Sequence, residues 1–248
     1  MPRQEDVLPL AHDSPPDTRL RRASSDDALH RFLRNNGLSL VLSALFLVAL
    51  AGQSVAGHRR YNDDQREHGQ PALSYPAYLA TPEFLEATME NWESEFLQMA
   101  AYVALTAMLF QKGSAESKAP DKQAPVDRRP DPRRPGAPGP VRRGGLALAF
   151  YRHSLSLAFA ALFLMSFSLH AVGGAAEFNQ DQAAHGQPKR VTVVEYMGGS
   201  RFWFESLQNW QSEFLAIAAM VVLTIFLRQH GSPESKPVDA AHSHTGSE

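Results

Sequence analysis

The sequence predicts an all-α membrane protein with four transmembrane helices, which form two helical hairpins that are parallel copies of one unit. Two runs, 37–57 and 154–176, contain no Asp, Glu, Lys or Arg. Each exceeds the roughly 18 residues that mark a membrane-span candidate. Shorter apolar segments follow at 96–111 and 214–227. Shared motifs relate the first pair of segments to the second, which indicates an internal duplication.

Three motifs carry the duplication. HGQP occurs at 68–71 and 185–188, NWxSEFL at 91–97 and 209–215, and GSxESK at 113–118 and 231–236. The spacing is 117 positions for the first motif and 118 for the other two, so the copies differ by one residue between them. Two spans per copy give both copies the same orientation, with a pseudo-twofold axis along the membrane normal.

The remaining segments are rich in Pro, Ser, Asp and Arg and cannot bury a core, so we expect them to be disordered. The resulting organisation is a disordered cytoplasmic N-terminal segment at 1–30, repeat 1 at 31–114, an Arg/Pro-rich linker at 115–145, repeat 2 at 146–231 and a disordered tail at 232–248. The chain contains no cysteine, which excludes disulfides and thiolate metal sites.

Turn and capping signals set the limits of the helices. In HGQP the histidine lies in a last helical turn, the glycine at the left-handed position and the proline just beyond, so the first helices should end near His68 and His185. Thr81 followed by Pro82 predicts the start of a second helix, and Ser200 is the expected cap in the second copy. The long helices then project beyond the bilayer on the outer side.

Lys and Arg gather in the N-terminal segment and the linker, whereas the loops within the hairpins are richer in Asp and Glu. The positive-inside tendency therefore places both termini and the linker in the cytoplasm. The bilayer is the expected partner. Anionic lipid head groups are a second candidate at the linker, although a role in topology explains its arginines equally well. The net charge of −2 gives no reason to expect nucleic acid.

A polar site inside the membrane is predicted from NWxSEFL. If its tryptophans mark the membrane interface, Glu95 and Glu213 lie about one helical turn further in. A carboxylate at that depth needs a partner. At matching depth the antiparallel first helices offer Gln53 in copy one and His170 in copy two, which are equivalent positions of the repeat.

This site has two interpretations. It could bind a cation, a proton or a polar head group, or it could be polar packing that fixes helix register while the acids reach toward water. Asparagines four residues before the acids share their helix face and could orient them or bond across helices. The predicted site comprises Glu95, Glu213, Gln53, His170, Asn91 and Asn209.

A metal site is a weaker hypothesis. Asp64 and His68 are spaced i, i+4, as are Asp181 and His185, and such pairs can ligate a metal. A solvated face and a helix stop explain them as well, and the Glu-x-x-His pattern of di-iron bundles is not found. No cofactor is therefore expected. The sequence also lacks a nucleophile elbow, a phosphate loop and a Ser/His/Asp set, so no enzyme class is indicated.

The chain resembles, over both copies, an uncharacterised family of bacterial multi-span membrane proteins, which is defined only as a domain of unknown function. The segments that carry the resemblance are 61–71, 90–99 and 113–118. The second copy departs from them where Gln211 replaces Glu93 and Pro233 replaces Ala115. The resemblance implies a bacterial inner-membrane location and carries over no activity and no site residues.

Three functions follow as hypotheses. The leading one is a non-enzymatic integral membrane protein that serves as a structural or interaction component of the cell envelope, either alone or as a homo-oligomer. The alternative is a small transporter or channel whose polar site includes Glu95 and Glu213. Four helices without a long polar stripe leave little room for a solute path in a monomer, which argues against transport. A metal-dependent membrane enzyme is the third.

Overall fold

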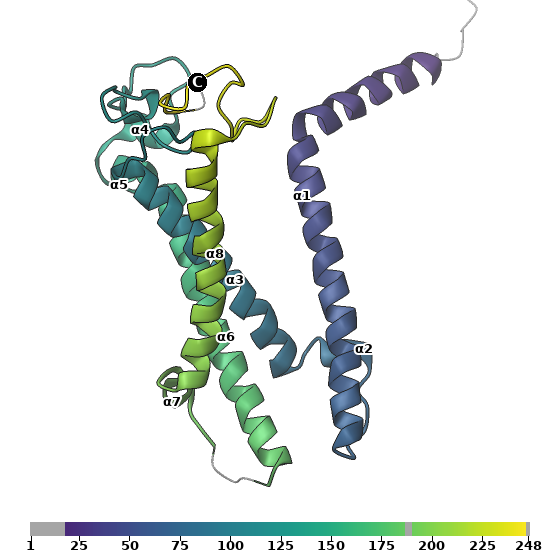
Figure 1. Ribbon diagram of the computed structural model, residues 1–248. Coiled ribbons are helices and arrows are strands. Elements are labelled where there is room, and N and C mark those ends of the chain that lie inside the picture. Colours follow the sequence, from purple (N-terminus) through teal and green to yellow (C-terminus); the bar gives the residue numbers. More distant parts are fainter. Residues whose placement is uncertain (1–17, 187–189, 247–248) are drawn as a thin grey trace, which may run out of the picture. The chain divides into compact units, whose positions relative to one another are not determined.

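The computed structural model describes residues 18–186 and 190–246, with side chains from Ala28 onward, and contains only helices, turns and loops in these ranges (Figure 1). The elements are α1 (Thr18–Glu67), α2 (Tyr75–Tyr78), α3 (Pro82–Met108), η1 (Pro125–Asp127), α4 (Gly139–Arg143), α5 (Gly145–Arg152), α6 (Ser154–Ala184), α7 (Val193–Met197) and α8 (Ser200–Phe226). The chain divides into two compact units, with the boundary between Arg59 and Arg60 in α1.

Three helices are long and apolar enough to cross a membrane: α1 from Ala28 onward, α6 and α8. The fourth predicted span, α3, differs in composition. Its N-terminal half carries five glutamates before the apolar segment begins, and this lowers its hydropathy. They are Glu83, Glu86, Glu90, Glu93 and Glu95.

The first unit consists, in its described part, of α1 up to Arg59. The segment predicted to be disordered is 1–30, and its residues 1–17 lie outside the described residues. The rest of it differs from the prediction, because residues 18–30 are already helical. This stretch contains Ala, Leu and Arg, which are favourable helix formers, and no Pro or Gly.

The second unit is organised around α3, α6 and α8, which run alongside one another (Figure 1). The main pairing is between α3 and α6. At their crossing, a Cβ atom added to Gly173 would lie 2.9 Å from the backbone nitrogen of Glu86. Only glycine allows two helix backbones to approach this closely. Gly174 likewise leaves room for the ring of Tyr196.

Local signals for helix ends are largely confirmed. Thr81 caps α3 by accepting a hydrogen bond from the amide of Phe84. Gly69 and Gly186 follow α1 and α6 with φ of +66° and +71°, as predicted for the helix stops. The prediction for Ser200 was wrong by one residue. Gly199 is the capping position of α8 and Ser200 is already helical, so no side chain caps this helix.

One hydrogen-bond pattern recurs at both helix-to-helix connections. After α1, the side-chain amide of Asn62 donates to the carbonyl of Leu73 and its oxygen accepts from the Leu73 amide, at 3.0 and 2.7 Å. After α6, Asn179 makes the same two bonds with Val191, at 2.9 and 2.8 Å. Each asparagine closes its connecting loop onto the helix, and the equivalent residues are 117 and 118 positions apart.

An ion pair recurs beside these asparagine clamps with its charges exchanged. Arg60 at the end of α1 contacts Glu83 in the first turn of α3, at 2.6 Å. The positions 117 and 118 residues later hold Glu177 in α6 and Arg201 in α8, which are 2.7 Å apart. The same two helix ends are therefore joined in both halves of the chain, by opposite assignments of charge.

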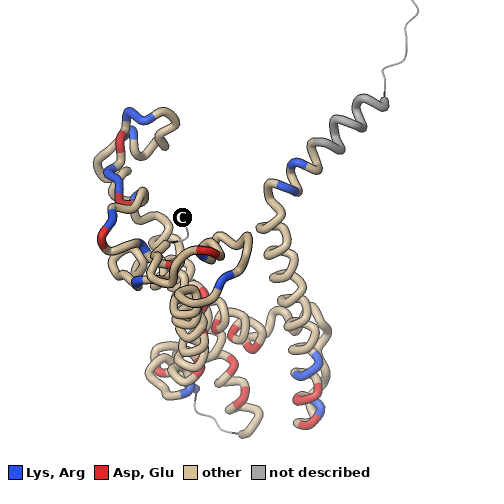
Figure 2. Tube along the Cα trace, turned by 45° about the horizontal axis from the view of Figure 1, so that its top comes forward, with Lys and Arg blue, Asp and Glu red and all other residues tan. Residues whose placement is uncertain are grey.

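Charge is segregated along the second unit (Figure 2). Lys and Arg concentrate in the loops that follow α3, where the six arginines of residues 128–143 are all exposed. Acidic residues concentrate in the first half of α3 and in the last two turns of α6. The two ends of this helix group therefore carry different charge.

Lys236 organises the C-terminal segment, although the composition of this segment predicted disorder. The residue is 1% exposed, and its ammonium group points at five carbonyl oxygens, so its three protons are shared. The acceptors are Gly113 at 2.5 Å, Ile225 at 3.1 Å, Ala241 at 3.4 Å, His242 at 3.0 Å and His244 at 3.0 Å. This buried cation is one of several polar contacts that hold the segment. Arg228 also donates to the carbonyl of Ala240, and the hydroxyl of Thr245 accepts from the amide of Gly113.

Candidate buried carboxylate–histidine site

Three glutamates line one face of α3, because Glu86, Glu90 and Glu93 follow the i, i+4, i+7 spacing of a helix. This face points toward α6 and α8. Glu93 has an exposed fraction of 0% and Glu86 of 8%. Burying a carboxyl group without partners costs several kcal/mol, so the neighbouring helices must supply them.

His170 of α6 is the central partner, and it is also fully buried. Its Nδ1 lies 3.0 Å from Oε2 of Glu93. The other oxygen of Glu93 accepts a hydrogen bond of 3.3 Å from the indole of Trp210. The ring of Phe202 lies against the imidazole, with a centroid distance of 4.8 Å. These contacts fix the position and the plane of the imidazole ring.

The second nitrogen of His170 has no hydrogen-bond partner. Its Nε2 faces Oε2 of Glu205 on α8 at 3.6 Å, which is too long for a hydrogen bond. Glu86, His170 and Glu205 each offer one ligand atom, and these three atoms lie within 4.8 Å of one another. Three helices thus bring one imidazole nitrogen and two carboxylates to a common point.

Two hydrogen-bond donors outside this set of three residues hold the carboxylate of Glu205. The phenol of Tyr196, on α7, donates to its Oε2 at 2.7 Å, and Nε of Arg201 donates to its Oε1 at 2.8 Å. Burial raises the pKa of Tyr196, so the phenol keeps its proton and acts as a donor. Arg201 also binds Glu177. Glu205 is therefore oriented by a phenol and a guanidinium together.

The cluster has an excess of acidic groups. Arg201 and His170 are the basic side chains among its described members. They face more carboxyl groups than they can neutralise, namely Glu86, Glu90, Glu93, Glu177 and Glu205. Glu86 and Glu93 are buried and the other three are partly buried, so this surplus of negative charge favours bound protons or a cation.

The predicted pairing of His170 with Glu213 is corrected by the structure. His170 is buried as expected, but its Nδ1 contacts Glu93 of α3. The reason is the pairing of helices. The α3 face that carries Glu86 and Glu93 packs against α6, whereas the prediction took the partner from within one hairpin.

The acids of NWxSEFL lie elsewhere. Glu95 is exposed and Glu213 is only partly buried. The backbone carbonyl of Glu213 accepts a hydrogen bond of 2.8 Å from the side chain of Gln98. Gln53 is exposed on α1, in the first unit. The structure therefore does not bring the predicted acids to His170.

The two predicted asparagines have different surroundings. Asn91 is exposed and donates to the carbonyl of Ala87 in its own helix, at 2.7 Å. Asn209 donates across helices to the carboxylate of Glu90 and also to the carbonyl of Glu205. Asn209 thus belongs to the buried cluster and bonds across helices.

The four weak metal candidates lie close together. The rings of His68 and His185 contact each other edge to face, with centroids 5.3 Å apart. Each Nδ1 lies 2.9 Å from the carbonyl oxygen of the aspartate four residues earlier, Asp64 or Asp181. All four side chains are exposed to solvent to a substantial degree. These contacts are those of a solvated helix end.

Most residues of the cluster were not selected from the sequence, although they occupy positions of the predicted repeat. The two predicted copies differ at these positions: Glu93 corresponds to Gln211, and Glu205 corresponds to Ala87. A comparison that looks for residues identical in both copies therefore does not find them. The signal that could have found them is the acidic i, i+4, i+7 face immediately before an apolar segment.

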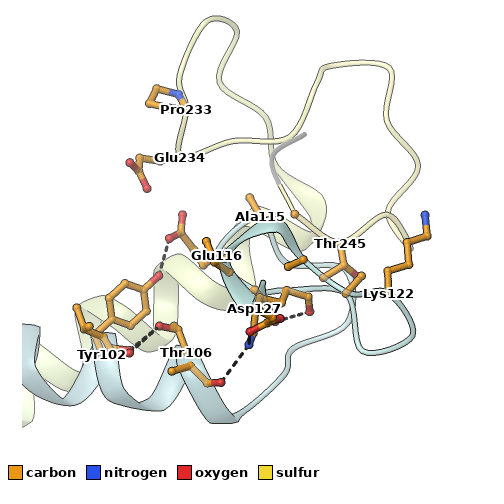
Figure 3. Close-up of a pocket in the computed structure, with 17 residues that line it drawn as sticks. Tyr102, Thr106, Ala115, Glu116, Lys122, Asp127, Pro233, Glu234 and Thr245 are labelled. Carbon is orange, nitrogen blue, oxygen red and sulfur yellow. Dashed lines mark hydrogen bonds and ion pairs between the residues drawn. The ribbon is translucent and has the colours of Figure 1, made fainter. Parts of the chain in front are cut away.

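A pocket of about 810 Å³ lies at the other end of α3 and α8, between the loops that follow α3 and the C-terminal segment. Figure 3 shows Glu116 and Glu234 on the same side of it, with Tyr102 bonded to Glu116. The two acids come from the two copies of GSxESK. Lys118, from the first of these motifs, binds Asp127 at 2.8 Å.

The comparisons with known proteins identify a family. The family described as a domain of unknown function (DUF6766) matches residues 29–247 as a single domain. The chain belongs to this family. No curated protein and no solved structure matches the chain.

Proposed function

We propose that this chain is a four-span membrane protein built from two parallel hairpin copies, and that its role is structural or interaction-based rather than enzymatic. The buried charge cluster is the observation that carries this proposal. Side chains of α3, α6 and α8 bond to one another there instead of lining an open path. Polar groups bonded between helices stabilise a bundle in lipid.

The duplication is supported by contacts that recur at equivalent positions. The asparagine clamps and the charge-exchanged ion pairs join corresponding helix ends, 117 to 118 residues apart. The fourth span is α3. It lies alongside two apolar helices, and it is the repeat counterpart of α8, which is itself long and apolar enough to cross a membrane.

The charge distribution supports an orientation with the linker in the cytoplasm of a bacterial cell and the α2 and α7 loops outside. Reporter fusions after Lys122 and Lys236 should give a cytoplasmic signal. Fusions near Ser74 and Thr192 should give an external one. A cytoplasmic signal at both Ser74 and Lys122 would contradict the crossing of α3 and with it the hairpin.

The role is tested against transport in proteoliposomes with an imposed pH or cation gradient. We expect no flux above that of empty vesicles, because the buried polar groups join helices and do not line a path. A flux that Glu95→Gln or Glu213→Gln abolishes, in a protein that keeps its unfolding temperature, would replace the proposed role by transport through the acids of NWxSEFL.

A further inference from the structure

We propose that Glu86, His170 and Glu205 form a binding site for a divalent transition-metal ion, with Glu93 as a positioning residue behind the histidine. The site joins α3, α6 and α8 through one ligand from each helix. It goes beyond the structural role proposed above and does not rest on it.

The unpartnered nitrogen of His170 is the first argument. The side chain has no exposed surface, and its Nε2 has no hydrogen-bond partner while facing the carboxylate of Glu205 at 3.6 Å. A buried polar nitrogen left without a partner is costly. A metal ion between His170, Glu86 and Glu205 would satisfy this nitrogen and both carboxylates at once.

The geometry is the second argument. Two donors bound to one zinc ion at about 2.0–2.1 Å with a tetrahedral angle lie about 3.3 Å apart. Nε2 of His170 and Oε2 of Glu205 are 3.6 Å apart. Small movements of these side chains would therefore bring them to coordination distance. One imidazole and two carboxylates suit Zn²⁺ or Mn²⁺ better than the softer ions that thiolates select.

The side chains that hydrogen-bond to the proposed ligands and orient them are the third argument. Metal-bound histidines usually donate their second ring nitrogen to a carboxylate, which fixes the ring. Glu93 occupies this position at 3.0 Å from Nδ1. Tyr196 and Arg201 hold Glu205 in the same way. The surplus of carboxyl groups in the cluster also favours a cation on electrostatic grounds.

A cavity adjoins Gly173, at the crossing of α3 and α6. A pocket of about 350 Å³ lies between the start of α3 and α6, and Gly173 forms part of its wall. The backbone of Glu86 lies against the same glycine. None of the three proposed ligands lines this pocket, so an ion that entered it would still have to pass the crossing of α3 and α6.

The experiment uses the full chain in detergent, stripped with chelator and then exposed to an equimolar amount of Zn²⁺ or Mn²⁺. Metal retained after desalting is measured by elemental analysis and affinity by calorimetry. We expect one ion per chain, and its loss in His170→Gln and Glu86→Gln. Glu93→Gln should keep the ligands and weaken binding about 10- to 100-fold. Glu95→Gln and His68→Gln should bind normally.

Three results would overturn the site. They are no retained metal in the unmutated chain, full retention in His170→Gln, or loss in His68→Gln, which would place the ion at the exposed histidines. X-ray absorption on the loaded unmutated protein keeps the test independent of variant folding. One imidazole with carboxylate oxygens supports the site, and two imidazoles contradict it.

Discussion

Replacing Glu93 tests whether the buried cluster stabilises the helix group. Glu93→Ala removes the partner of His170 Nδ1 and the acceptor of the Trp210 indole. Breaking a buried ion pair from one side costs about 3–5 kcal/mol. Glu93→Gln keeps an acceptor and loses the charge, so a smaller cost of about 1.5–3 kcal/mol is expected, the range for hydrogen bonds to charged groups.

Unfolding of the metal-free protein in mixed micelles, followed by tryptophan fluorescence, measures these costs. Glu95→Gln is the matched control, because it changes an exposed glutamate two positions away and should cost less than about 0.5 kcal/mol. Combining Glu93→Gln with His170→Gln should give a coupling energy of about 0.5–3 kcal/mol. Equal costs for Glu93→Gln and Glu95→Gln, or strict additivity in the double variant, would refute the reasoning.

Three further predictions concern the ends of the helices. Arg60→Glu should lower stability by about 0.2–1 kcal/mol, as for an exposed pair, and adding Glu83→Arg should restore it in the same unfolding assay. Burial raises the pKa of Glu116 above its ordinary value of 4.5. Its contribution to stability is therefore present below the ordinary pKa and lost as the pH rises through the raised pKa, and Glu116→Gln should flatten that part of a stability–pH profile. Lys236→Met should leave carbonyl oxygens unpaired and expose residues 237–246 to proteinase K, whereas continued protection would show that the lysine does not hold this segment.

The helices could be predicted because their signals are local. Apolar runs, the capping threonine Thr81 and the glycines Gly69 and Gly186 each act within a few residues. The cap of α8 was placed one residue late because Ser200 has the right chemistry, whereas the extended conformation belongs to Gly199. Local chemistry thus locates an end to within a residue.

The cluster could not be predicted in the same way because it depends on helix rotation and pairing. Glu93 and Glu95 are two positions apart and differ little in sequence context, yet one is fully buried and the other exposed. Which one faces inward is decided by the contact of α3 with α6, at Gly173. The order around Lys236 was missed for a related reason, since its acceptors include Gly113, which is distant in sequence.

The exchanged charges of the two ion pairs have a consequence for how the chain assembles. Arg60 meets Glu83, and Glu177 meets Arg201. If the helices exchanged partners between the halves, Arg60 would face Arg201 and Glu177 would face Glu83, and like charges would repel. Two stretches of one chain that share motifs can pair wrongly with each other as the chain folds. The reversed polarity makes that error unfavourable. It keeps the end of α1 with the start of α3 and the end of α6 with the start of α8, while α3 packs along α6.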